Sequence, residues 1–186
     1  IKRKNNSEII GLGVCRENLF LDNNIKYNKE DLIKLWTSII ELLDKNNIKW
    51  KIYTNGLKDD NEFAIKLADT LGLDKTKLVI PKTPQDLVEQ ISNFKGIIAT
   101  RLHSCIVAYS LGVPAVGLVW NKKLKMFGGN IGYEERFIEV RDFKAELIVD
   151  RLNKSLNEGY SKISADEYVK TDKKALEEFL NSYCNN

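Results

Sequence analysis

Short, mostly apolar runs alternate along the chain with longer stretches in which apolar residues recur every three or four positions. Short apolar runs are typical of parallel strands that are buried on both faces, and the longer period is that of helices with one buried side. The pattern predicts strands at residues 8–14, 49–54, 77–80, 96–99, 113–120 and 136–140. It predicts helices at about 28–47, 61–71, 83–93, 101–111, 121–127, 144–157 and 165–182.

Capping residues support several of these helix boundaries. Asn28 is a favourable N-cap, and Thr83 followed by Pro84 combines a cap with a proline in the first turn. Gly72 and Gly112 each follow a helix at the position where a left-handed residue commonly ends one. The local signals therefore agree with the periodicity.

Strands that alternate with helices predict an α/β fold with a doubly wound, mostly parallel, Rossmann-like sheet of about six strands. We expect residues 1–186 to form a single domain, with the last helix packing back onto it. In the commonest doubly wound order the first and fourth strands are neighbours, and ligands bind beyond their carboxyl ends. The loops that begin at Cys15 and Thr100 would then meet at a ligand site.

Composition narrows the class of protein. The 29 Lys and Arg and 26 Asp and Glu residues give a net charge of +3 without a dense basic stripe, so we expect no nucleic acid partner. No apolar run reaches the length needed to cross a bilayer, and no signal peptide is recognisable. Cys15, Cys105 and Cys184 are far apart, which favours reduced thiols in the cytoplasm over a disulfide framework.

The start of the chain suggests a larger parent. The only methionine is Met126, so the chain begins at Ile1 without an initiator. Residues 1–6 are mostly polar and basic, as in a linker that precedes a strand. We expect the chain to be a piece of a longer protein.

The run GLGVCR at residues 11–16 is an incomplete dinucleotide-binding fingerprint. Arg16 stands where the third glycine is needed. Gly11 and Gly13 fall inside the predicted strand rather than in the turn after it. We expect neither a nicotinamide nor a flavin site.

The strongest candidate site is the run TRLHS, which directly follows the fourth predicted strand. It contains His103, the only histidine of the chain, and histidine is the side chain suited to proton transfer near neutral pH. Thr100 is a potential helix cap, and free N–H groups at a helix start favour an anion. Arg101 adds a planar donor fork for a carboxylate or phosphate. The alternative is that His103 packs against the sheet and Arg101 is a solvated surface charge.

Two further groups of charged residues are open to more than one interpretation. Lys122, Lys123 and Lys125 follow the fifth strand, either as a solvated basic face or with one lysine directed into the crevice. The pair Asp59-Asp60 has the pattern of a solvated turn. With one histidine and scattered cysteines, no metal cluster is expected.

Taken together, TRLHSCIVAYSLGVPAVGLVWNKKLKMF, residues 100–127, resembles the polysaccharide pyruvyl transferase family. In that family an Arg-Leu-His at a helix start precedes Gly-Val-Pro, then an aromatic residue that ends a strand, a lysine three residues later and a phenylalanine four after that. Trp120 stands where the family more often has tyrosine, and Arg16 is similar to an arginine near the start of the family's second domain. The matching residues here are Arg101, Leu102, His103, Gly112, Val113, Pro114, Trp120, Lys123 and Phe127.

The resemblance implies two domains arranged as in GT-B type transferases, with this chain as the C-terminal half and an N-terminal domain as its missing partner. The implied enzyme transfers pyruvate from phosphoenolpyruvate to a sugar of a cell-surface polysaccharide and forms a ketal. The acceptor would be a sugar or lipid-linked glycan, which would bring the enzyme to the inner face of the membrane as a peripheral protein. The isolated half is expected to bind donor weakly and to be inactive.

The resemblance also implies roles for individual residues. His103 is the expected acid that protonates the enol carbon, with Arg101 beside it in the catalytic site. The donor is itself a substrate, and no cofactor or metal is expected. The expected donor-binding residues are Arg16, Thr100, Arg101, Ser104 and Lys123. Two alternatives stay open: half of a glycosyltransferase that binds a nucleotide sugar in the same crevice, and a non-catalytic binding module.

Overall fold

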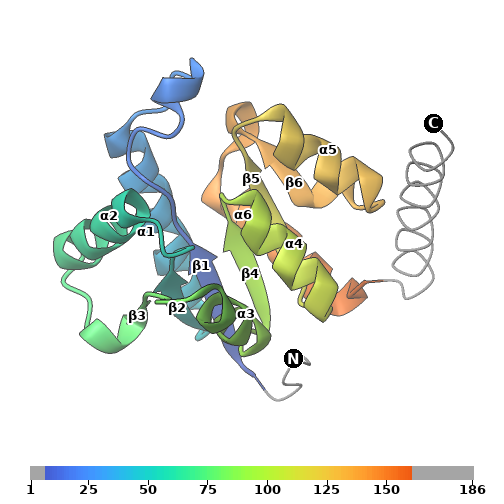
Figure 1. Ribbon diagram of the computed structural model, residues 1–186, viewed down its shortest axis with the longest axis horizontal. Helices are drawn as coiled ribbons and strands as arrows, with labels where there is room; N and C mark the ends of the chain where they lie inside the picture. Colours follow the sequence, from blue (N-terminus) through green and yellow to red (C-terminus); the bar gives the residue numbers. More distant parts are fainter. Residues whose placement is uncertain (1–6, 161–186) are drawn as a thin grey trace, which may run out of the picture.

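Six parallel strands form one sheet in the computed structural model, which describes residues 7–160 (Figure 1). The strands are β1 (Ile9–Gly13), β2 (Lys49–Tyr53), β3 (Leu78–Val79), β4 (Gly96–Ala99), β5 (Ala115–Val119) and β6 (Phe137–Glu139). Their order is β3-β2-β1-β4-β5-β6, and every neighbouring pair is parallel. The predicted doubly wound α/β fold is therefore confirmed, with β1 beside β4 where the winding reverses.

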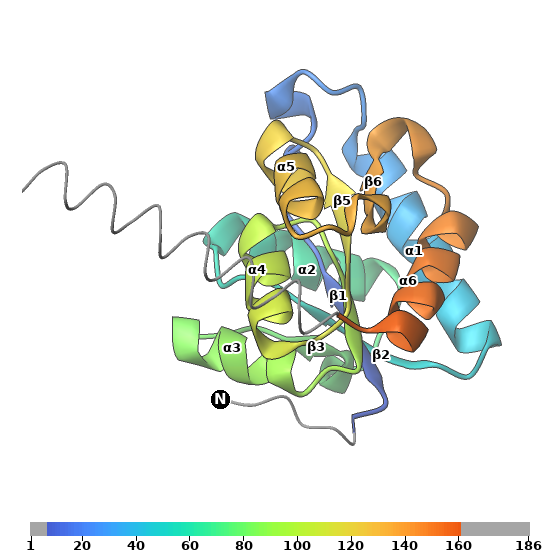
Figure 2. The same cartoon turned by 90° about the vertical axis from the view of Figure 1, so that its right-hand side faces the viewer.

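Helices cover both faces of the sheet. They are α1 (Lys29–Lys45), α2 (Lys58–Thr70), α3 (Pro84–Ser92), α4 (Leu102–Leu111), α5 (Lys122–Asn130) and α6 (Ala145–Glu158). Short 3₁₀ helices occur at Leu21–Asn23, Lys75–Lys77, Glu134–Arg136 and Val140–Asp142. Figure 2 shows α1 and α6 on one face and α3, α4 and α5 on the other. Each face buries its own apolar cluster, so the sheet is covered on both sides.

The predicted caps of two helices are confirmed. The Asn28 side chain accepts from the Asp31 N–H at the start of α1, and Thr83 accepts from the Asp86 N–H at the start of α3. In both cases the aspartate also accepts from the cap residue, which completes a capping box. The last predicted helix, at about 165–182, lies outside the described residues.

Two predicted boundaries are wrong. Helix α2 begins at Lys58 rather than at 61, so Asp59 and Asp60 lie in a helical first turn, where the helix dipole favours acidic side chains. Helix α5 continues through Gly128-Gly129 to Asn130 instead of ending at Phe127. A Cβ on Gly128 would lie 2.3 Å from the Phe137 ring, so this glycine serves close packing and does not end the helix.

Within residues 7–160, none of the helices combines the length and the apolar character that crossing a membrane requires.

Candidate functional site

The ends of three strands are tied together where the winding reverses. Thr100, directly after β4, donates both its N–H and its hydroxyl to the carbonyl of Gly13 at the end of β1, at 3.1 and 3.0 Å. The indole N–H of Trp120, directly after β5, donates to the Thr100 carbonyl at 2.7 Å. Thr100 is not the cap of α4 as predicted, because its buried hydroxyl is already bonded to β1.

Helix α4 begins without a side-chain cap. Its N-cap residue is Arg101, which makes no capping hydrogen bond, and its first turn contains no acidic residue. By contrast, α1, α3 and α5 have side-chain caps, and α2 and α6 have acidic residues in the first turn. Among the α-helices of residues 7–160, α4 is therefore the one that has neither a side-chain cap nor an acidic residue in its first turn. The positive end of its dipole and its free N–H groups favour binding of an anion.

His103 lies in this first turn and is exposed. It borders a cavity of about 600 Å³ between α4, the β2–α2 loop and the β3–α3 loop. The alternative in which His103 packs against the sheet is therefore wrong. The cavity is lined by Asn55, Gly56, Leu57, Pro81, Lys82, Thr83, Pro84, Leu87, Val88, Arg101, His103 and Val107.

Arg101 is bound on one side by a buried carboxylate. Its Nε donates to Asp60 Oδ2 at 2.9 Å and its Nη2 donates to Asp60 Oδ1 at 2.5 Å. Asp60 is completely buried, and only 16% of the Arg101 side chain is exposed. Burial alone would lower the pKa of Arg101, but the hydrogen bonds and charge of Asp60 raise it. Both expectations of a solvated charge, for Asp60 and for Arg101, are wrong.

Ser104 does not line the cavity but binds Asn55, a residue that does. Its hydroxyl is buried and donates to Asn55 Oδ1 at 2.6 Å, which links α4 to the β2–α2 loop. Ser104 and Thr100 were expected to donate to the ligand. In the structure both hydroxyls are bonded within the protein, and neither residue lines the cavity of His103.

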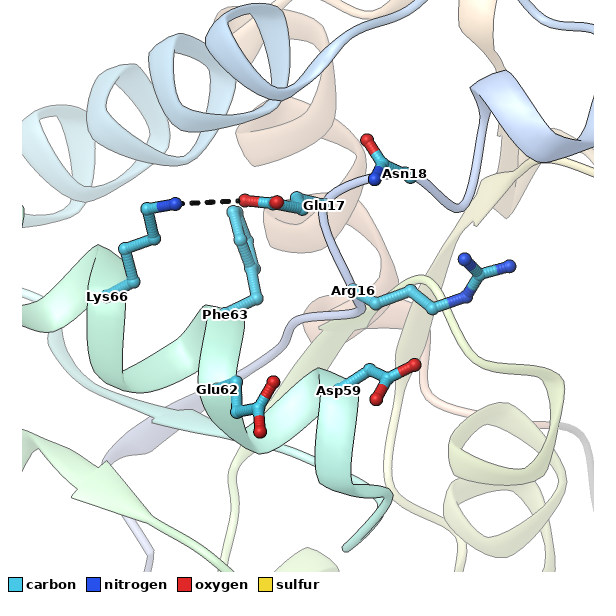
Figure 3. A pocket seen from close by; sticks show the side chains of 7 residues that line it. All are labelled: Arg16, Glu17, Asn18, Asp59, Glu62, Phe63 and Lys66. Carbon is cyan, nitrogen blue, oxygen red and sulfur yellow. Dashed lines mark hydrogen bonds and ion pairs between the residues drawn. The ribbon is translucent and has the colours of Figure 1, made fainter.

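Arg16 belongs to a second cavity, of about 250 Å³, between the loop after β1 and α2 (Figure 3). Glu17 is directed toward Lys66 at one end of this cavity, and Arg16 lies at the other. The Arg16 guanidinium is paired with Asp22. The structure therefore does not bring the Arg16 side chain into the cavity of His103; its backbone N–H donates to Asp60 at 2.8 Å instead.

The lysines after β5 are also separate from the cavity of His103. Lys123 is exposed on α5 and does not line that cavity. Lys125 is paired with Glu139, whose hydrogen bond and charge raise the pKa of the lysine. The cation that the structure adds to the cavity is Lys82. Its position after β3, directly before the Thr83-Pro84 cap, is the signal that sequence reasoning could have used.

The described residues 7–160 contain neither a cluster of metal ligands nor an exposed cysteine. No group of three or more His, Cys, Asp or Glu side chains in that range could hold a metal ion. Cys15 and Cys105 are buried, and burial raises the pKa of each thiol to about 12. Both thiols are therefore protonated and shielded near neutral pH.

Comparison with known families places the chain in a described family. The family model described as polysaccharide pyruvyl transferase matches residues 7–122, more than half of the chain. The matched range contains Arg101, His103 and Trp120, and it ends just before Lys123. No curated protein sequence matches the chain.

Solved structures support the fold. The crystal structure of TarM matches with a TM-score of 0.55 and 18% identity over 97% of this chain and 36% of that chain. A mutant of S. aureus TarM in complex with fondaparinux, alpha-GlcNAc-glycerol and UDP matches with a TM-score of 0.51 and 16% identity, over 100% of this chain and 37% of that chain. The likeness is one of fold, and this chain spans little more than a third of the length of those structures.

Proposed function

Because the chain belongs to the polysaccharide pyruvyl transferase family, we propose that it is the donor-binding half of an enzyme that transfers pyruvate from phosphoenolpyruvate to a glycan sugar. The observation that carries the proposal is the exposed His103 on the uncapped first turn of α4, in a cavity that Arg101 also lines. A second domain would supply much of the site for the acceptor, which is a sugar or lipid-linked glycan.

The chemistry explains why a histidine belongs at this position. His103 protonates the enol carbon of the donor, and a sugar hydroxyl forms a C–O bond to the resulting cation-like centre. The proton of that hydroxyl returns to His103. The C–O bond to phosphate then breaks, the second hydroxyl closes the ketal, and its proton leaves with inorganic phosphate. The residue must therefore give up and recover a proton near neutral pH.

The donor carries a carboxylate and a phosphate, and the cavity offers groups for both. The Arg101–Asp60 pair is formally neutral, so the net attraction must come largely from the start of α4 and from Lys82. Arg101 contributes the donors that Asp60 does not occupy. This division differs from the expectation that Arg16, Arg101 and Lys123 together hold the donor.

Phosphoenolpyruvate should raise the melting temperature of the chain. At about 100 times its dissociation constant a ligand that binds the native state alone stabilises it by about 2.7 kcal/mol. A thermal titration measures the effect, with pyruvate as the control that lacks the phosphate. If phosphoenolpyruvate leaves the melting temperature unchanged at millimolar concentration, the donor assignment is wrong.

One observation favours the second candidate, a site for a nucleotide sugar. The cavity is larger than phosphoenolpyruvate requires and has an apolar wall that could receive a base, formed by Leu57, Leu87, Val88 and Val107. In that case UDP rather than phosphoenolpyruvate should stabilise the chain in the same titration. Stabilisation by neither ligand would favour a non-catalytic binding module.

Lys82→Ala should weaken phosphoenolpyruvate binding about fivefold, the effect of ~1 kcal/mol for an exposed charge. Lys123→Ala removes the same charge outside the cavity, and Lys125→Ala removes one that is already paired with Glu139. Calorimetry on the three variants separates the positions. A loss confined to Lys123→Ala would place the donor at the end of β5, as the family pattern implied.

A further inference from the structure

Asp60 satisfies three donors with two oxygens in a completely buried position. Oδ1 accepts from the Arg16 N–H at 2.8 Å and from Arg101 Nη2 at 2.5 Å, and Oδ2 accepts from Arg101 Nε at 2.9 Å. A carboxylate is the side chain group that accepts at both oxygens and carries the compensating charge. An amide of the same shape would direct its NH₂ group at one of these donors.

The three partners come from elements that are distant in the sequence. Asp60 lies in the first turn of α2, Arg16 follows β1, and Arg101 stands between β4 and α4. One carboxylate thus fixes the two loops that meet where the winding reverses. It holds the Nε and Nη2 side of the guanidinium, so Nη1 takes no part in the contact with Asp60, and Arg101 is one of the residues that line the cavity.

We propose that Asp60 is a positioning residue, which fixes Arg101 so that the free side of its guanidinium is held toward an anion in the cavity of His103. The identity of that anion as the phosphate or carboxylate of phosphoenolpyruvate rests on the proposed function. A guanidinium held in advance does not have to be ordered when the ligand binds. Asp60 therefore acts on the ligand through Arg101, without touching it.

Asp60→Asn tests the proposal, and Asp59→Asn is the matched control. Asp59 is the preceding residue of the same turn and is exposed. It lines the cavity of Arg16 but not the cavity of His103. We expect Asp60→Asn to weaken phosphoenolpyruvate binding roughly tenfold, as loss of a charge-assisted contact does. Asp59→Asn should leave the affinity within about twofold of the parent. Wild-type affinity in a folded Asp60→Asn variant overturns the proposal.

A second variant keeps the test decisive where Asp60→Asn does not fold. Arg101→Lys retains a positive charge next to Asp60 but has no planar fork, so it cannot grip both oxygens of the carboxylate and hold a further donor in a fixed direction toward the ligand. We expect it to weaken phosphoenolpyruvate binding at least fivefold, with a folded protein by circular dichroism. Affinity equal to that of the parent would show that a point charge suffices, and the positioning role would be wrong.

The Nε–Hε resonance of Arg101 separates this proposal from the proposed function. In the wild-type chain we expect inorganic phosphate to shift that resonance, and we expect Asp60→Asn to abolish the shift while Asp59→Asn preserves it. If phosphate shifts it and phosphoenolpyruvate does not bind, the donor assignment fails and the role of Asp60 stands. If neither anion shifts it in the wild type, Arg101 does not face an anion and the role of Asp60 is overturned.

Discussion

His103→Gln is expected to lower the turnover of the full-length enzyme by about 10²–10⁴, the usual contribution of a positioned general acid. The side chain is exposed, so the loss should come from chemistry and not from packing. Glutamine keeps the polar character of the side chain and lacks a proton that it could donate near neutral pH. Turnover with phosphoenolpyruvate and a glycan acceptor measures the effect.

Two further measurements assign the loss to the chemical step. The melting temperature of His103→Gln should stay near that of the parent, because no core contact is removed. Donor affinity should also survive, since we propose that Arg101, Lys82 and the start of α4 hold the anion. Ser110→Ala changes an exposed residue near the other end of α4 and is the control for the effect of a surface substitution on this helix. A variant that keeps more than about a tenth of the parent turnover would contradict the assignment, because general acids contribute more.

The fold was predictable because the signals that determine it are local. The strand at 96–99 coincides with β4, and the caps at Asn28 and Thr83 each satisfy N–H groups within one turn. The doubly wound order followed from the alternation of strands and helices. The same order predicted that His103 lies just beyond the carboxyl end of β4, and the structure has it there, in the first turn of α4.

The partners of the site residues were not predictable, because they depend on distances between elements. Asp59 and Asp60 are neighbouring residues of the same type, yet Asp59 is exposed and Asp60 is buried. The difference arises from the direction that each side chain takes once α2 begins at Lys58. The sequence predicts a role for the Arg16 guanidinium, but the backbone N–H of Arg16 makes the contact with Asp60. The sequence shows that Lys82 precedes the Thr83-Pro84 cap, but that this loop and α4 border the same cavity depends on how the elements pack.

Arg101 shows how a buried partner changes what a substitution means. From the sequence alone, Arg101→Ala would remove one contact to an anion. In the structure it also leaves Asp60 completely buried without its counter-charge. Removal of one partner of a buried ion pair typically costs about 3–5 kcal/mol, because the remaining charge is neither solvated nor paired. We therefore expect Arg101→Ala to lower the free energy of unfolding by about that amount.

Urea denaturation measures this loss, and a double variant identifies its cause. Arg101→Met combined with Asp60→Leu replaces both charges by apolar side chains, and such replacements of a buried pair are often neutral or stabilising. The double variant should therefore recover most of the stability that Arg101→Ala loses, yet bind phosphoenolpyruvate no better. If Arg101→Ala is as stable as the parent, Asp60 does not depend on Arg101 for its charge. If the double variant is as unstable as Arg101→Ala, the loss comes from packing around Arg101 rather than from the stranded carboxylate.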